Sequence, residues 1–135
     1  MPAPAALRVL VADPCRAHRM LVTGALLRWQ ILPTIACDGA QALEIVETRG
    51  FDLLLMDLLM PVMDGVVAIA KIRQFEREHP GRRPMPIVAY TALDLRGESS
   101  ALRRVGLNGV LTKPCTASSL QSCLERCCPQ GFWAD

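Results

Sequence analysis

Apolar runs alternate with segments of helical periodicity along most of the chain. Continuous apolar runs predict buried strands at Leu7–Ala12, Leu32–Cys37, Phe51–Met56, Pro86–Tyr90 and Val110–Thr112. Apolar residues at helical spacing predict helices at Cys15–Trp29, Gln41–Thr48, Gly65–Glu78, about Arg96–Val105 and Ser118–Cys127. Five strands that are each followed by a helix and are mostly apolar on both faces predict an α/β fold, in which a parallel sheet is covered on both sides.

Two of the predicted helices carry more specific expectations. In the first, one face bears Ala17, Met20, Leu21, Gly24 and Leu27, and we expect this face to pack against the sheet. In the last, Ser118 stands where an N-cap is expected. The 135 residues suit one domain with a core, and we expect it to span residues 7–128, between tails at 1–6 and 129–135.

Composition and charge narrow the class of protein. Hydrophobic residues make up 51% of the chain, which is typical of a folded globular domain. The net charge is +2 and the basic residues are scattered, apart from Arg82-Arg83 and Arg103-Arg104, so nucleic-acid binding is not expected. No apolar run is long enough to span a bilayer, and the first apolar stretch ends on Asp13 too early for a secretory signal. We therefore expect a soluble, cytoplasmic protein without membrane contact.

Six cysteines in a small chain can indicate disulfides or a metal site, but their spacing favours neither. Cys15, Cys37 and Cys115 are isolated, whereas Cys123, Cys127 and Cys128 belong to the last predicted helix. None of them forms a C-x-x-C pair of the kind that binds zinc. We interpret them as small buried apolar residues in a reducing compartment.

Polar residues recur at one place in these units, the carboxyl end of a strand. Asp13, Asp57, Thr91 and Lys113 end the first, third, fourth and fifth strands. In an open parallel sheet, ligands bind outside these ends where the strand order reverses, so we expect the four side chains to converge on one cleft. Taken singly, each has an ordinary interpretation as a turn residue, a helix start, a strand residue or a surface lysine.

Asp57 is the most informative of the four, because it interrupts a run that is otherwise apolar from Leu53 to Met60. An unpaired carboxylate in such a run is costly, so we expect it to meet a cation. The carboxylates of Asp13 and Asp57 would hold Mg²⁺, which prefers oxygen ligands, while Thr91 and Lys113 would take charge from phosphoryl oxygens. A free oxygen of Asp57 would attack phosphorus in line and become an acyl phosphate.

With these residues the chain resembles the receiver domains of response regulators, over roughly residues 6–128. The matching pieces are Val9-Leu10-Val11-Ala12-Asp13, Met56-Asp57-Leu58-Leu59-Met60-Pro61-Val62-Met63-Asp64-Gly65, Tyr90-Thr91-Ala92 and Leu111-Thr112-Lys113-Pro114. The second piece is the most specific. Together they look most like the receivers attached to hybrid histidine kinases of two-component systems.

The resemblance implies a fold and a set of roles. The fold is flavodoxin-like and doubly wound, with five parallel strands in the order 2-1-3-4-5 and five helices. Asp57 accepts a phosphoryl group from a phosphohistidine of a histidine kinase or a histidine phosphotransfer protein, so the chain is an acceptor domain of a phosphorelay and not an enzyme. Mg²⁺ is held by Asp13, Asp57 and the backbone carbonyl of Leu59. Thr91 and Lys113 contact the phosphoryl group, and the bond Lys113-Pro114 is cis.

Departures from the family pattern alter these expectations. Ala12 replaces the first of two adjacent acids, which weakens Mg²⁺ binding. Val110 stands where the family has an aromatic switch residue, so coupling between Thr91 and the output face is altered or weak. In this family the side chains two residues after the positions of Asp57 and Thr91 flank the approach of the attacking water. Here they are Leu59 and Leu93, which cannot hydrogen-bond to a water, so we expect the phosphoryl group to be lost slowly.

The third helix departs in a different way, because its start is apolar nearly all round where the family carries charge. This pattern suggests a homodimer or partner contact built around Val67 and Ile69. The alternative is that the face is merely less polar and packs against its own loops.

Three hypotheses about function follow. The first is a receiver that accepts a phosphoryl group. The second is a degenerate receiver kept as a protein-binding module, which Ala12 and Val110 favour. The third is a flavin or nucleotide binder on the same architecture, since fold alone does not fix function. Against the third, the residues after the first strand are Asp13-Pro14-Cys15-Arg16 rather than a glycine-rich phosphate loop.

Overall fold

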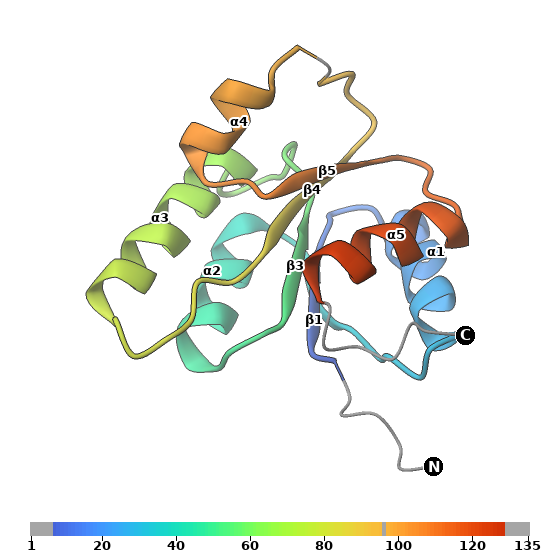
Figure 1. The fold of residues 1–135 in the computed structure, drawn as a ribbon, viewed down its shortest axis with the longest axis horizontal. Helices are drawn as coiled ribbons and strands as arrows, with labels where there is room; N and C mark the ends of the chain where they lie inside the picture. Colours follow the sequence, from blue (N-terminus) through green and yellow to red (C-terminus); the bar gives the residue numbers. More distant parts are fainter. Residues whose placement is uncertain (1–6, 96, 129–135) are drawn as a thin grey trace.

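A computed structural model describes residues 7–95 and 97–128, which form one parallel sheet with helices on both faces (Figure 1). The elements in chain order are β1 (Val9–Ala12), α1 (Arg16–Leu27), β2 (Thr34–Ala36), α2 (Gly39–Thr48), β3 (Leu53–Met56), α3 (Gly65–Glu78), β4 (Ile87–Thr91), α4 (Ser99–Val105), β5 (Gly109–Thr112) and α5 (Ala117–Cys127). All ten predicted elements are present. The tails predicted at 1–6 and 129–135, and the predicted helix start at Arg96, lie outside the described residues.

The sheet order is β2-β1-β3-β4-β5, as predicted. Every neighbouring pair is parallel, and β1 pairs on one side with β2, through Leu10 and Thr34, and on the other with β3, through Val9 and Leu53. The chain therefore leaves β1 toward one side of the sheet and later returns on its other side. This reversal opens the carboxyl ends of β1 and β3 to a common cleft.

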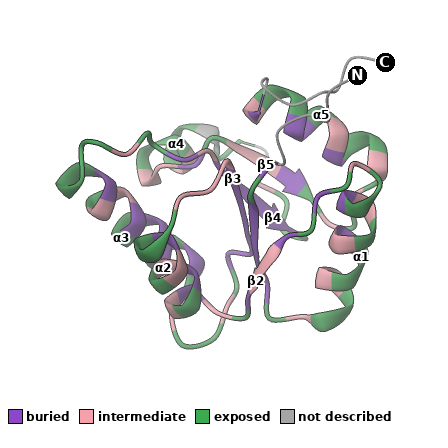
Figure 2. Ribbon diagram, turned by 90° about the horizontal axis from the view of Figure 1, so that it is seen from below, coloured by how far each residue is buried: buried purple, intermediate pink, exposed green. Residues whose placement is uncertain are grey.

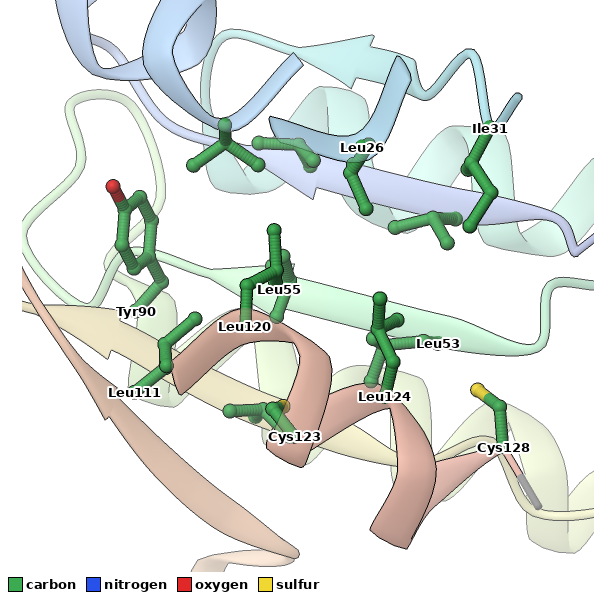
Figure 3. Close-up of a cluster of buried hydrophobic side chains, with 14 of the residues drawn as sticks. Leu26, Ile31, Leu53, Leu55, Tyr90, Leu111, Leu120, Cys123, Leu124 and Cys128 are labelled. Atoms are coloured by element: carbon green, nitrogen blue, oxygen red, sulfur yellow. The ribbon is translucent and has the colours of Figure 1, made fainter. Parts of the chain in front are cut away.

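The core consists of two apolar layers, one on each face of the sheet, and the strands are buried between them (Figure 2). Alternate residues of β1 point to opposite layers: Val9 and Val11 face α1 and α5, whereas Leu10 and Ala12 face α2 and α3. Figure 3 shows the first layer, where Leu26 of α1 and Leu120 and Leu124 of α5 close over the strands. Burial on both faces explains why the strands are continuous apolar runs.

Two glycines are required by close approach or backbone conformation. A Cβ on Gly65 would lie 2.6 Å from the backbone oxygen of Asp57, so only glycine lets α3 begin this close to the end of β3. Asp64 caps the same helix by accepting from the backbone N–H of Val66. Gly106 ends α4 at φ +106°, in the left-handed region that glycine tolerates.

The predicted inward face of α1 is wrong. Val22 and Leu26 are the buried residues of this helix, while Met20, Leu21 and Leu27 are 62%, 60% and 50% exposed. The helix carries apolar residues on two faces, so its periodicity alone does not determine which face meets the sheet. Contact with the first core layer selects Val22 and Leu26 and leaves the other face in solvent.

The predicted pairing of Val67 and Ile69 on one exposed face of α3 is also wrong. Ile69 is fully buried in the second core layer, whereas Val67 is 46% exposed. Residues two apart on a helix point in nearly opposite directions, so these two side chains cannot line the same contact.

The predicted N-cap of the last helix is wrong by two residues. Thr116, not Ser118, caps α5, in a capping box with Ser119. In the part of the chain that the structure describes, no helix is both long and apolar enough to cross a membrane.

Candidate functional site

Three of the four polar residues at strand ends, Asp13, Asp57 and Lys113, are held by the sheet ladder itself, and the fourth, Thr91, is the last residue of β4. The backbone N–H of Asp13 donates to Ala36, that of Asp57 to Ala12, and that of Lys113 to Thr91, at 3.0, 2.9 and 2.9 Å. Each residue therefore continues the hydrogen bonding of its strand by one step before the chain turns away. This places their side chains at one edge of the sheet, as the sequence predicted.

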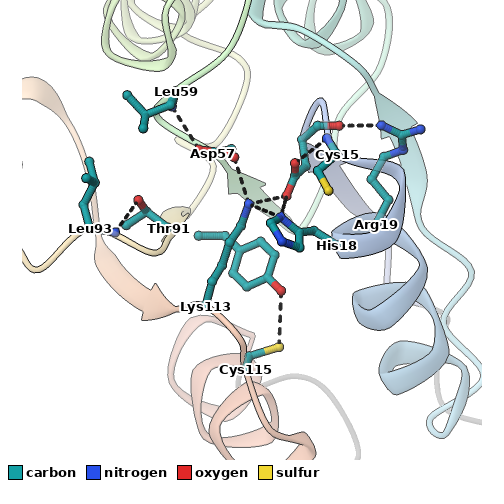
Figure 4. Close-up of polar contacts among 11 residues, drawn as sticks. Cys15, His18, Arg19, Asp57, Leu59, Thr91, Leu93, Lys113 and Cys115 are labelled. Carbon is teal, nitrogen blue, oxygen red and sulfur yellow. Dashed lines mark hydrogen bonds and ion pairs between the residues drawn. The ribbon is translucent and has the colours of Figure 1, made fainter.

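The ammonium of Lys113 joins the two carboxylates (Figure 4). Its Nζ lies 2.6 Å from Oδ2 of Asp13 and 2.8 Å from Oδ2 of Asp57. The third acceptor is Nδ1 of His18, at 3.0 Å. A lysine ammonium has three hydrogens to donate, so the three contacts use all of them.

The other oxygen of each carboxylate is fixed by the loop that follows it. Oδ1 of Asp57 accepts from the backbone N–H of Leu59 at 2.9 Å, and Oδ1 of Asp13 accepts from that of Cys15 at 2.8 Å. Both side chains are buried, yet each keeps at least one partner on every oxygen. Each carboxylate is thus oriented by a backbone N–H on one oxygen and by the Lys113 ammonium on the other.

Opposing effects act on the pKa of Lys113. Burial lowers it, but the hydrogen bonds and charges of Asp13 and Asp57 outweigh burial, so the pKa lies above its ordinary value of 10.5. The ammonium also lies 4.8 Å from the centre of the Tyr90 ring. Burial raises the pKa of Tyr90, which keeps the phenol neutral beneath the site.

Thr91 and the two leucines complete the predicted set. Thr91 is buried at the end of β4, and its Oγ1 accepts from the backbone N–H of Leu93 at 3.1 Å. This bond uses a lone pair of Oγ1 and leaves the hydroxyl hydrogen able to donate. The side chains of Leu59 and Leu93 are exposed beside the site (Figure 4).

Ala12 and Val110 have different surroundings. Ala12 is fully buried, pairs with Met56 across the sheet and belongs to the second core layer. The position that carries an acid in the family is therefore part of the apolar core here. Val110 is half-buried against the same layer and, with Leu93, Asp94 and Leu95, lines a hollow of about 620 Å³.

The donor set fits Mg²⁺ in its chemistry. Asp13 and Asp57 supply two carboxylates that share the single ammonium of Lys113, and the Leu59 carbonyl is two residues from Asp57. Within residues 7–95 and 97–128, however, no three His, Cys, Asp or Glu side chains form a ready metal cage. Mg²⁺ keeps several waters, so two carboxylates and a carbonyl can hold it, with weaker affinity than a third acid would give.

His18 was not among the site residues predicted from the sequence. His18 lies on the first turn of α1, the helix that follows β1, and its Nδ1 is 3.7 Å from Oδ2 of Asp13. Because α1 begins three residues after Asp13, a side chain in its first turn can reach the end of β1, and this short spacing is the signal in the sequence that could have identified His18. We therefore place His18 beside the site as a residue that orients Lys113.

The cysteines behave partly as expected. All six are free, and Cys123 and Cys128 are buried, but Cys37 is exposed. A hydrogen bond with Cys123 lowers the pKa of Cys127 to about 7, although burial acts in the opposite direction. Burial raises the pKa of Cys128 to about 12.

Comparison with known families and proteins identifies one class. The family model described as "response regulator receiver domain" matches residues 9–125. The chain is 40% identical over 114 residues to the sensor histidine kinase GacS of Pseudomonas protegens, and 35% identical over 122 residues to the signal transduction histidine-protein kinase BarA of Escherichia coli. These matches cover 84% and 90% of this chain, but it spans only 12% and 13% of the two relatives.

Solved structures show the same likeness. The magnesium-bound receiver domain of the sensor histidine kinase PA1611 from Pseudomonas aeruginosa is 30% identical, with a TM-score of 0.79, and the match covers 91% of this chain and 98% of that one. The receiver domain of Ssk1 from Saccharomyces cerevisiae, solved with the histidine phosphotransfer protein Ypd1, gives a TM-score of 0.84 at 27% identity, covering 98% and 95%.

Proposed function

This chain belongs to the response regulator receiver domain family, and on that premise we propose that Asp57 accepts a phosphoryl group from a phosphohistidine. The donor is a histidine kinase or a histidine phosphotransfer protein. In this role the chain is the acceptor that becomes phosphorylated, and it is not an enzyme that converts a substrate over many cycles. It is a receiver of a two-component system related to those of hybrid histidine kinases.

One observation carries the proposal: a single ammonium is shared by Asp13 and Asp57, two buried carboxylates at the mouth of a parallel sheet. Burying a carboxylate costs free energy unless the group is paired and hydrogen-bonded. Buried carboxylates with a charged partner in a cleft are frequent at functional sites. Here Oδ2 of Asp57 pairs with the Lys113 ammonium at the carboxyl end of β3, which orients the carboxylate as a nucleophile for an incoming phosphoryl group.

The proposed transfer moves a phosphoryl group from a histidine nitrogen of the donor to a carboxylate oxygen of Asp57. An oxygen of Asp57 forms a bond to phosphorus while the phosphorus–nitrogen bond of the donor breaks, and the electron pair of that bond returns to the imidazole, which takes up a proton. Lys113, already 2.8 Å from Oδ2, is placed to pair with a phosphoryl oxygen, and the Thr91 hydroxyl can donate to another. The buried Tyr90 ring beneath Lys113 limits where the ammonium can move.

We propose Mg²⁺ as the cofactor, held by Asp13, Asp57 and the Leu59 carbonyl. When bound, the metal supplies positive charge for the transferring phosphoryl oxygens. The fit of the donors supports this, as does the magnesium ion in the cleft of the PA1611 receiver. Because Ala12 removes one acid, we expect a higher Mg²⁺ requirement than a receiver with two adjacent acids.

A histidine phosphotransfer protein or kinase is the proposed partner. Support comes from the Ssk1 receiver, which was solved with the phosphotransfer protein Ypd1, and from relatives that are themselves histidine kinases. The kinase activity and signals of those longer proteins are not carried over to this chain.

A second candidate is a degenerate receiver that binds a partner without being phosphorylated. Ala12 favours it, because a methyl group buried in the second core layer stands where the family carries an acid. The intact set of Asp13, Asp57, Thr91 and Lys113 favours phosphorylation instead.

Incubation with acetyl phosphate and Mg²⁺, followed by intact mass measurement, separates the two candidates. The phosphorylation hypothesis predicts addition of one phosphoryl group that is stable to acid and labile to base. Asp52→Asn, at the opposite edge of the sheet, is the matched control and keeps the modification. An unmodified wild type at saturating donor and Mg²⁺ favours the binding module.

A further inference from the structure

The edge of the sheet opposite Asp57 gathers positive charge that the sequence shows as scattered. Two adjoining grooves lie there. One, of about 510 Å³ at the amino ends of β1, β3 and β4, is lined by Arg8, Arg49, Arg82 and Arg83. The other, of about 1060 Å³ between α3 and α4, is lined by Arg73, Arg77, Arg82, Arg103 and Arg104. Helices α3 and α4 lie side by side on this flank (Figure 1).

The excess of basic over acidic residues is much larger at this edge than over the whole chain. The two grooves hold eight of the fifteen basic residues but only two of the thirteen acids, Asp52 and Glu76. The rest of the chain therefore carries seven basic residues against eleven acidic ones. A net charge of +2 therefore conceals an excess of positive charge at this edge and of negative charge over the remaining residues, and the basic edge attracts anions.

Within residues 7–95 and 97–128, most of these arginines have no acidic partner. Arg73 pairs with Glu76 at 2.7 Å, and among the described residues it is the one groove arginine in an ion pair. Arg82 donates to the backbone carbonyls of Val46, Glu47 and Arg49, which hold the guanidinium in place but leave its charge uncompensated. Fixed cations that lack counter-charges form a site ready for an anionic ligand.

The grooves favour a flexible acidic chain over other polyanions. The aromatic faces nearby are already occupied, because Arg49 covers Phe51 and both Arg82 and His79 stack on Phe75. Among the described residues that line or flank the grooves, each of these rings is therefore covered and does not offer a free face to a nucleic-acid base. Exposed apolar side chains that could enter a bilayer, such as Met20, Leu21 and Leu27, lie on α1 and not here.

The positions of the arginines also select for shape. Arg73 and Arg82 are partly buried in the groove walls, so a ligand must enter the groove to reach them. An extended peptide can insert single carboxylates between the walls, whereas a nucleic-acid duplex presents its phosphates on a rigid convex surface. Arginine forks match carboxylates in bidentate geometry.

We propose that this arginine edge, the two grooves lined by the eight arginines, binds an extended acidic segment of a partner protein. The site is independent of Asp57, from which it is separated by the length of the strands. It gives the receiver a second contact with a partner while the phosphorylation cleft remains accessible.

The test uses fluorescence anisotropy of a labelled peptide of alternating Asp and Glu at low ionic strength. In the groove variant, Arg77→Gln, Arg103→Gln and Arg104→Gln are combined. In the control, the exposed Arg16, Arg28 and Arg126 on other surfaces are changed to Gln, with the same loss of charge. We expect the Kd to rise roughly ten-fold or more in the groove variant and by less than about three-fold in the control.

Three results would overturn the proposal. These are absence of peptide binding by the wild type, equal loss in both variants, and tighter, groove-dependent binding of a DNA duplex or of anionic vesicles used as competitors. A neutral peptide of Asn and Gln should not bind. Asp57→Asn should bind as the wild type does, so failure of the phosphorylation account leaves this test unaffected.

Discussion

Lys113 and Asp57 lie 56 positions apart in the chain and end strands that are separated by β4, yet Nζ of Lys113 is 2.8 Å from Oδ2 of Asp57. The same ammonium is 2.6 Å from Asp13, which ends β1. Three strand ends therefore meet at one cation. We therefore expect the contact of Lys113 with the two carboxylates to contribute both to the free energy of unfolding and to the proposed phosphorylation of Asp57.

The first prediction concerns Lys113. Lys113→Met leaves two buried carboxylates facing each other without a cation, so the free energy of unfolding should fall by roughly 3 kcal/mol in urea denaturation near pH 7. Lys71→Met, at an exposed position on α3, should change it little. Because the folded-state pKa of Lys113 is raised, its stabilising effect is complete below its ordinary pKa of 10.5 and is lost as the pH rises through the folded pKa.

The difference in unfolding free energy between wild type and Lys113→Met should therefore stay constant from neutral pH to about pH 10 and shrink above it. Titrating both proteins with urea along this pH range measures the difference directly. A gap that widens at high pH is incompatible with the shared ammonium.

Val62 is the second case. This β-branched residue has a φ of +66° in the turn between Pro61 and Met63, a conformation that costs such a side chain free energy. Val62→Asn should raise the free energy of unfolding by roughly 1 kcal/mol, since Asn tolerates the left-handed region. Val67→Asn, exposed on α3, is the control and should not stabilise. No gain from Val62→Asn would mean that the turn relaxes around valine.

The cysteines of α5 give the third prediction. The pKa of Cys127 is lowered to about 7 by its hydrogen bond with Cys123, so its alkylation rate should be half-maximal near that pH. Cys128, whose pKa is raised by burial, should remain unmodified at neutral pH. Peptide mass spectrometry after brief iodoacetamide treatment resolves the sites. Cys123→Ala should move the Cys127 midpoint toward an ordinary thiol value, and an unchanged midpoint would exclude this hydrogen bond as the cause.

The sequence predicted the site better than the helix faces. Asp13, Asp57, Thr91 and Lys113 were correctly placed because strand ends follow directly from where continuous apolar runs stop. Faces of α1 and α3 were misassigned at Met20 and Ile69, because both helices carry apolar residues on more than one side and only the sheet selects between them. Such a choice depends on tertiary contacts that periodicity does not contain.

The arginine edge and His18 were missed for a related reason. Arg8, Arg49 and Arg104 are far apart in the chain. They line adjoining grooves because the amino ends of the strands and the carboxyl ends of α3 and α4 lie at the same edge of the molecule. His18 reaches Lys113 across 95 positions. The family resemblance predicted the topology, and the topology determines which distant segments are neighbours. It does not determine which side chains of those segments contact one another.

The fourth prediction rests on the proposed phosphorylation. The exposed Leu59 cannot orient a water beside Asp57, so Leu59→Asn should speed loss of the phosphoryl group by roughly ten-fold at saturating Mg²⁺. The decay of the phosphorylated form, followed by intact mass, measures this rate. Leu32→Asn, exposed far from the site, should decay like the wild type. Equal decay in the Leu59 and Leu32 variants would show that Leu59 does not limit the water.

The central claim is that Asp57 is the phosphoacceptor, and locating the modified residue tests it most directly. The chain is phosphorylated with a phosphohistidine donor or acetyl phosphate in Mg²⁺, then reduced with borohydride, which converts an aspartyl phosphate to homoserine. Peptide sequencing by mass spectrometry should find homoserine at position 57 alone, and none in Asp57→Asn. Homoserine at Asp13 or Asp64, or a phosphoryl group on His18 with Asp57 unmodified, would contradict the account.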